Sequence, residues 1–318
     1  MTPAPRSAAA MEKAGSGKLV WAAIAVTVLL WASAFVGIRT AAADYSPGAL
    51  TLGRIAVGTL TLALMLPLTR ALGRRRFTPQ APAATIRLPR GRVLALIIVW
   101  GVAWFAAYNV ALNAAEQHID AGTAALLVNL APMIVAVLAG LFLGEGFPRR
   151  LITGMFIALI GVVFIAVSTS TGKFDALGVG LGLLAAVLYG SAATLQKSLL
   201  RHVDAPTMTW IGCLAGTIVC LPFTPQLVEA VSTAPLSSTL AVVYLGVFPT
   251  AIAFTTWGYV LSRSSAGRTA ASTYAVPAVV VLLSWLLLGE VPPAAALFGG
   301  ALALAGVAVA TLRRRRVS

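Results

Sequence analysis

The chain has 318 residues, of which 59% are hydrophobic and 10% are charged. Soluble globular proteins carry roughly 25% charged residues, so the composition excludes that class and indicates a protein embedded in a lipid bilayer. The formal net charge is +14, but the basic residues lie between apolar segments and form no continuous stripe with interleaved aromatic residues. We therefore expect no nucleic-acid partner.

A polar tail, residues 1–18, precedes the first apolar segment, and a basic tail, residues 313–318, follows the last. Ala32-Ser33-Ala34 resembles a signal-peptidase site, but apolar residues continue to Ile38, which predicts an uncleaved helix. Ten segments are each near the length that crosses the hydrocarbon core. They are 19–38, 48–69, 93–114, 121–143, 149–168, 176–196, 207–223, 237–260, 267–288 and 293–312. The sequence predicts an all-α integral membrane protein with ten transmembrane helices.

The basic residues gather in alternate connections. With a cytoplasmic N-terminus, almost all of the 23 lysines and arginines fall on the inner side. Arg39 and Lys173 fall outside, and Arg54 lies within the second segment. Because cytoplasmic loops carry the excess of positive charge, we expect a multi-pass protein of the cell (inner) membrane with both termini in the cytoplasm.

One stretch occurs twice. Residues 121–146 have a similar sequence to residues 266–291, at an offset of 145 residues. Pro132 corresponds to Pro277, and Glu145 corresponds to Glu290. The two copies cross the membrane in opposite directions, because each half has an odd number of helices. We expect two inverted five-helix repeats, residues 19–171 and 172–312.

Polar and aromatic residues at mid-depth must face protein or water rather than lipid. They concentrate in the first, third, fourth, sixth, eighth and ninth segments, and we expect these segments to line a central cavity. The candidate substrate-binding residues are Trp31, Ser33, Trp104, Tyr108, Asn109, Asn129, Tyr189, Ser191, Trp257 and Tyr274.

Three prolines interrupt these segments. Pro132, Pro249 and Pro277 each remove a backbone donor and free a carbonyl four residues earlier. Asn129 and Tyr274 precede their prolines by three residues and share the face of the kink. Kinks are common in transmembrane helices, but symmetric kinks in both halves favour a substrate site at the repeat interface.

Three charged residues need an interpretation, and two of them, Glu145 and Arg54, have two. Glu145 and Glu290 end the repeated stretch, three residues before a proline. They can form structural corners that serve the next helix, or Glu145 can form a gating ion pair with Arg149 or Arg150. Arg54 lies about 9 Å inside its segment. It can extend to the outer interface, or it can contact an anionic substrate group.

The remaining features argue against catalysis. His118 and His202 have no neighbouring ligand set, so we expect no metal, and no cofactor motif or catalytic serine is evident. All nine carboxylates lie in tails, loops or segment ends, which favours exchange or facilitated exit over a midplane proton relay. The glycine-rich fifth and tenth segments indicate a scaffold or a homodimer contact.

The twofold pattern of small residues, Pro132 or Pro277, Leu-Gly-Glu and a glycine-containing last helix resembles the EamA branch of the drug/metabolite transporter superfamily. The resemblance covers residues 19–312. It implies an inner-membrane carrier that moves small metabolites, often amino acids or toxic amphiphiles, outward by alternating access.

We therefore expect a secondary transporter, an exporter or exchanger with a small-molecule substrate. Aromatic faces suit apolar or cationic groups, and amides and hydroxyls orient polar ones. One alternative is a lipid flippase or a non-transporting assembly subunit, which a cavity that opens sideways would indicate. Another is a membrane-embedded enzyme, which would need a polar catalytic cluster.

Overall fold

The computed structural model of the chain describes residues 8–77, 89–119, 121–169, 175–288 and 293–311. These residues form helices and connections, without a strand. In chain order the helices are α1 (Ala8–Ala41), α2 (Pro47–Phe77), α3 (Gly91–Gly101), η1 (Val102–Ala107), α4 (Tyr108–His118), α5 (Ala121–Val128), α6 (Ala131–Phe142), α7 (Arg149–Thr169), α8 (Ala176–Leu199), α9 (Ala205–Cys220), η2 (Leu221–Phe223), α10 (Thr224–Thr233), α11 (Leu236–Leu245), η3 (Gly246–Ile252), α12 (Ala253–Arg263), α13 (Ala266–Ser272), α14 (Ala275–Leu288) and α15 (Ala294–Thr311).

Within the described ranges, nine helical segments are long and apolar enough to cross a membrane. A shorter apolar segment, Leu126–Phe142, lies where the sequence predicts the fourth span. The all-α integral membrane fold is therefore confirmed. Several elements differ from the prediction. The first two helices are longer than predicted, since α1 begins at Ala8 and α2 ends at Phe77. In addition, α10 occupies part of an expected loop, and the fourth and ninth spans are each broken into two helices, α5 with α6 and α13 with α14.

Each break ends two or three residues before one of the repeated prolines. The first lies at Asn129–Leu130, and the second at Thr273–Tyr274. Leu130 N–H donates to Leu127 O, and Thr273 N–H donates to Ala270 O, so each break is a tighter turn than an α-helix makes. The chain therefore interrupts its helices at mid-depth instead of only bending them.

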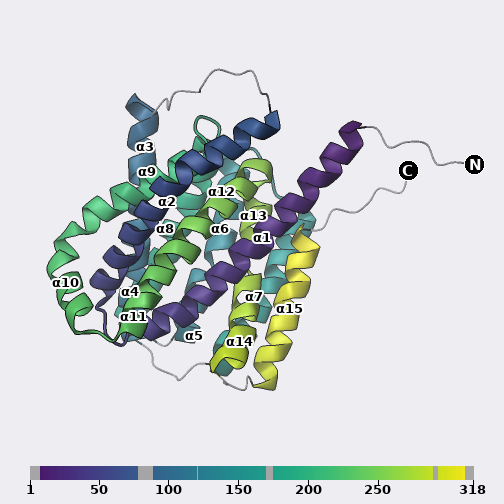
Figure 1. Cartoon of the computed structure of the whole chain (residues 1–318). Coiled ribbons are helices and arrows are strands. Elements are labelled where there is room, and N and C mark those ends of the chain that lie inside the picture. The colour runs from purple at the N-terminus through teal and green to yellow at the C-terminus, as the bar shows by residue number, and fades with distance from the viewer. Residues whose placement is uncertain (1–7, 78–88, 120, 170–174, 289–292, 312–318) are drawn as a thin grey trace, which may run out of the picture.

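The start of α1 and the end of α15 lie on one face of the bundle, which we call the termini face (Figure 1). The connection between α1 and α2, residues 42–46, lies on the opposite face. Since successive spans alternate in direction, α1 runs away from the termini face and α8 runs toward it.

The fifth span of each half, α7 and α15, packs against the other along glycines. A Cβ added at Gly154 would lie 2.5 Å from Ala310 N, and one at Gly161 would lie 2.4 Å from Ala303 N. Gly299 and Gly306 face the same seam from α15: a Cβ added at either would lie 2.6 Å from a carbonyl oxygen, that of Gly161 or Gly154, respectively. The glycines of these helices thus serve an internal contact between the halves.

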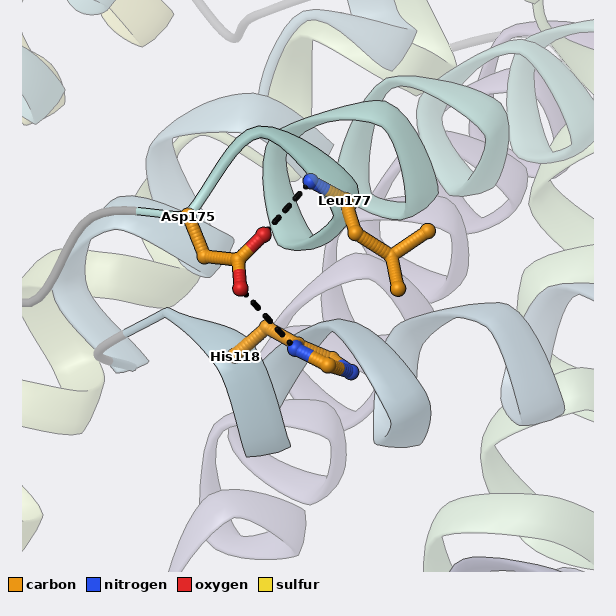
Figure 2. Close-up of polar contacts among 3 residues, drawn as sticks. All are labelled: His118, Asp175 and Leu177. Carbon is orange, nitrogen blue, oxygen red and sulfur yellow. Dashed lines mark hydrogen bonds and ion pairs between the residues drawn. The ribbon is translucent and has the colours of Figure 1, made fainter.

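On the opposite face, Asp175 joins α8 to the end of α4 (Figure 2). Its Oδ1 accepts from Leu177 N–H at 2.7 Å as the cap of α8, and its Oδ2 lies 3.3 Å from His118 Nδ1. The backbone hydrogen bond from Leu177, and then the one from His118, lowers the pKa of the Asp175 carboxyl. This contact fixes where α4 ends relative to the start of α8.

Candidate functional site

A cavity lies at mid-depth between the two halves. It is lined from α1, α2, η1, α4, the α5–α6 break, α8, η3, α12 and the α13–α14 break. Its volume of about 120 Å³ is smaller than the roughly 300–1,000 Å³ of sites for drug-sized ligands. A wider hollow of about 510 Å³ shares Ile38 and Asn113 with it and includes the α1–α2 connection. The cavity and the wider hollow therefore adjoin at Ile38 and Asn113, on the side of the opposite face.

The structure brings six of the ten predicted substrate-binding residues together, with Arg54 and Pro132 beside them. Those that line the cavity are Trp31, Arg54, Trp104, Tyr108, Asn109, Asn129, Pro132 and Tyr189. They come from helices that are distant in sequence, so the polarity of mid-depth positions predicted part of the cavity lining.

Other predicted residues lie elsewhere. Ser191 is exposed on α8, and Tyr274 is completely buried against Ala136 and Met155. Ser33 Oγ lies 2.6 Å from Tyr244 Oη, and Trp257 Nε1 donates to Gln196 Oε1 at 2.9 Å. None of these four side chains lines the cavity.

The prolines and glutamates also differ in placement. Pro132 lines the cavity, whereas Pro249 and Pro277 are buried beside it. The Pro249 carbonyl accepts from Trp31 Nε1 at 3.2 Å, which ties α1 to η3. Glu290 lies outside the described residues.

Two π-helical segments, one from each half, frame the cavity. Pro249 lies within η3 and cannot donate to Leu245 O, and Thr250 Oγ1 donates to that carbonyl instead at 2.8 Å. In η1, the Asn109 amide nitrogen donates to Trp104 O and Phe105 O at 3.1 and 3.0 Å. Side chains thus satisfy carbonyls that the wider helical turn leaves exposed, as backbone within a membrane requires. Single π-turns are frequent at functional sites.

Arg54 spans the space between these two segments. Its Nε donates to Thr250 Oγ1 at 2.9 Å, and its Nη1 lies 3.5 Å from Asn109 Oδ1, which is a long hydrogen bond. The side chain therefore turns into the cavity between the halves and does not extend to the outer interface, which was one of its two interpretations.

Aromatic rings form the floor of the cavity. Ring centroids lie 4.7 Å apart for Phe105 and Phe254, 5.2 Å for Trp104 and Tyr189, and 5.5 Å for Trp31 and Phe254. Phe105 precedes Asn109 by one helical turn, and Phe254 follows Thr250 by one turn. Because these two helices run in opposite directions, both aromatics lie about 5 Å closer to the termini face than the polar residues.

Nearer the termini face, polar contacts join helices to one another. Lys197 Nζ donates to Leu261 O and Ser264 O, both at 2.6 Å. The Glu145 carboxylate accepts from Ala266 N–H at 2.6 Å and Gly267 N–H at 3.1 Å, at the start of α13. The interpretation in which Glu145 serves the following helix is therefore corrected, because the recorded partner of its carboxylate is a helix of the other half.

Several cavity residues were not predicted. Thr250, Phe105, Phe254 and Asn113 all line it. Asn113 follows Asn109 by four residues, which places both on one helix face, and Thr250 follows a mid-span proline. These spacings could have identified both residues, whereas a phenylalanine in an apolar segment gives no such signal.

Comparison with known proteins agrees with the fold. The EamA-like transporter family matches residues 19–167 and 176–312, and the chain belongs to that family of membrane transporters, which are not enzymes. The chain is 38% identical over 302 residues to a probable terminal-alkyne amino-acid exporter of Streptantibioticus cattleyicolor, covering 94% of this chain and 96% of that protein. It is 33% identical over 289 residues to the uncharacterized transporter YdfC of Bacillus subtilis, covering 91% and 90%.

Two more distant relatives extend the comparison. A probable amino-acid metabolite efflux pump of Salmonella typhimurium is 25% identical over 244 residues, covering 73% of this chain and 82% of that protein. A solved crystal structure has a TM-score of 0.72 at 22% identity and covers 96% of this chain and 99% of its own, so it shares the fold. The chain is thus a multi-pass membrane transporter with a small-molecule substrate.

Proposed function

We propose that this protein is a secondary transporter that exports or exchanges small amino-acid-like metabolites by alternating access through the aromatic-lined cavity. The observation that carries the proposal is the asymmetry of the site. A wider hollow at the opposite face adjoins the cavity at Ile38 and Asn113, whereas at the termini face the Glu145 and Lys197 contacts tie helices to one another. A carrier caught in one of two states has this arrangement.

The proposed location is the cell (inner) membrane with both termini in the cytoplasm. The distribution of basic residues supports this orientation. In that orientation the opposite face is external, and the structure corresponds to an outward-open state. Substrate would be released outside from this outward-open state, after it has been bound from the cytoplasm in an inward-open state.

The names of two relatives support the substrate class. One is a probable exporter of terminal-alkyne amino acids and another a probable efflux pump for amino-acid metabolites. A small cavity with polar groups above and aromatic rings below suits such a molecule, which has a charged head and a short apolar side chain.

The proposal includes no proton relay through the cavity. Within the part of the chain that the structure describes, no aspartate or glutamate lines it. Exchange or facilitated exit therefore needs the fewest assumptions, and flux should continue without a pH gradient.

Purified protein in liposomes tests the function. We expect saturable counterflow of radiolabelled L-propargylglycine, an amino acid with a terminal alkyne, at equal pH inside and outside. Protein-free liposomes are the control. Transfer of labelled lipid between leaflets without amino-acid flux would show that the protein is a flippase instead. If the protein moved neither lipid nor any amino acid of a panel, transport of this class would be contradicted.

A further inference from the structure

Arg54 is a charged side chain within a membrane span. It lies seven residues into α2, about 10 Å from the start of the helix. A charge at this depth is costly and is retained only where it pairs with another group or faces a water-filled cavity on a substrate pathway. Arg54 lines the cavity, so its position indicates a role in the site.

The protein does not neutralise this charge with a carboxylate among the residues that the structure describes. The recorded hydrogen bonds of Arg54 go to Thr250 and Asn109, which are both neutral. A guanidinium has five N–H donors in a planar fork, and these contacts occupy two of them. The remaining donors suit one bidentate acceptor such as a carboxylate.

The partners of Arg54 are themselves fixed. Thr250 Oγ1 is held by Leu245 O, and the Asn109 amide nitrogen is held by Trp104 O and Phe105 O. Each partner can therefore offer Arg54 only an oxygen, as Thr250 does at 2.9 Å. The guanidinium is thus oriented before any ligand arrives, which reduces the entropy cost of binding.

The depth of the groups fixes the pose of a ligand. Arg54 lies beside Thr250 and Asn109, whereas Phe254 and Phe105 lie one turn closer to the termini face. An acid bound to Arg54 would place its apolar substituent against these rings. A second negative charge would find no further cation in the lining, which favours a monocarboxylate over a phosphate ester.

From this geometry we propose that Arg54 binds the carboxylate of the transported molecule, so that the site accepts zwitterionic amino acids and rejects amines that lack a carboxylate. This inference rests on the proposed function and adds the group that is recognised. Under this proposal a ligand must carry a carboxylate to bind, whereas the α-amino group contributes less to binding.

Three matched ligands test the proposal on the unmodified protein. They are L-propargylglycine, 4-pentynoate, which lacks the amino group, and but-3-ynylamine, which lacks the carboxylate. Binding is measured by quenching of tryptophan fluorescence in detergent, since Trp31 and Trp104 line the cavity. We expect the amino acid and the acid to bind and the amine to bind roughly 10- to 100-fold more weakly, the effect of losing hydrogen bonds to a charged group.

Variants assign the effect to one residue. Arg54→Gln should weaken binding of the amino acid and the acid by the same factor and leave the amine unchanged. Arg54→Lys should be intermediate, because an ammonium keeps the charge but loses the bidentate fork. Arg263→Gln removes an exposed cation that stacks on Tyr259 at 3.8 Å, and it should bind all three ligands like the wild type.

The outcomes separate this proposal from transport itself. Equal affinity for the amine and the acid in the wild type overturns it, and this comparison holds even if Arg54→Gln does not fold. If a folded Arg54→Gln protein binds the acid as tightly as the wild type, the carboxylate proposal is also overturned. In either case, counterflow by the wild-type protein would leave the proposed function intact. Arg54-dependent binding without counterflow would instead contradict transport and leave the carboxylate site standing.

Discussion

The Glu145 carboxylate accepts a hydrogen bond of 2.6 Å from the backbone N–H of Ala266, the first residue of α13 in the other half of the chain. Gly144 and Gly146 flank the glutamate with φ of +67° and +64°, a conformation that favours glycine. The turn delivers a negative charge to a helix N-terminus, where free N–H groups and the helix dipole stabilise it.

This contact predicts the behaviour of Glu145 variants. Glu145→Ala should speed amide hydrogen exchange at Ala266 and Gly267 roughly fivefold, which corresponds to a lost cap of about 1 kcal/mol. Glu145→Gln should have a smaller effect, because it keeps one acceptor oxygen. Glu229→Gln changes an exposed glutamate on α10 and is the matched control. Equal exchange in Glu145→Ala and the wild type would show that the cap does not hold α13.

Thr250 should matter for stability as well as for the site. Thr250→Val leaves Leu245 O and Arg54 Nε without their recorded partner, so we expect the free energy of unfolding to fall by about 1–3 kcal/mol. Thr250→Ser keeps the hydroxyl and should unfold near the wild-type temperature in detergent. If the serine variant were as unstable as the valine variant, packing of the methyl group rather than the hydrogen bonds would be responsible.

Glycines of the α7–α15 seam should not tolerate side chains. Gly161→Leu would drive carbon atoms into the α15 backbone, since even a Cβ lies 2.4 Å from Ala303 N. We expect loss of the monodisperse peak in size-exclusion chromatography. Gly180→Leu is the control, because a Cβ at Gly180 on α8 meets nothing within 4 Å. A monodisperse Gly161→Leu protein would mean that the two helices can separate.

The aromatic floor should select for the substrate side chain. Trp104→Ala removes a ring that packs on Tyr189 and Phe254. We expect propargylglycine to bind roughly tenfold more weakly while alanine is unaffected, since only the longer side chain reaches the floor. Trp285→Ala on α14, where the ring is 47% exposed, is the matched control. Equal losses for both amino acids would contradict this pose.

Asp175 gives a pH dependence with a defined sign. Its pKa is lowered in the folded protein by the hydrogen bonds from Leu177 and His118. Its stabilising effect is therefore complete above the ordinary aspartate pKa of about 4 and is lost as the pH falls through the folded value. Asp175→Asn should lower the unfolding temperature at pH 7, and the difference from the wild type should shrink below about pH 4. If the difference in unfolding temperature between the wild type and Asp175→Asn did not change with pH, the effect would come from the hydrogen bond to Leu177 N–H and not from the charge of Asp175.

Most of the fold follows from the lengths of apolar segments, which set where spans begin and end. The helix breaks could not be derived in this way, because proline indicates a kink but does not say whether the helix resumes after a turn. The segments η1 and η3 also leave no signature in hydropathy. They depend on Asn109 and Thr250 satisfying the carbonyls that the wider turn exposes.

The cavity lining was predictable in part, because a polar residue at mid-depth in the membrane must face protein or water rather than lipid. Mid-depth polarity located Asn109 and Asn129, but it does not say which face of a helix a residue occupies, and Ser191 lies on the exposed face of α8. Tyr274 corresponds to Asn129 in the repeat, yet only Asn129 lines the cavity. A symmetric sequence cannot indicate which of two corresponding residues lines the cavity.

The glycine seam between α7 and α15 has a practical consequence for measuring motion. Backbones in direct contact cannot slide without collision, so the pair supplies a fixed frame within the molecule. Spin labels at the exposed positions Phe156 on α7 and Leu304 on α15 should report the same separation with and without substrate. Any change in distance from this frame to a third label can then be assigned to the helix that carries it.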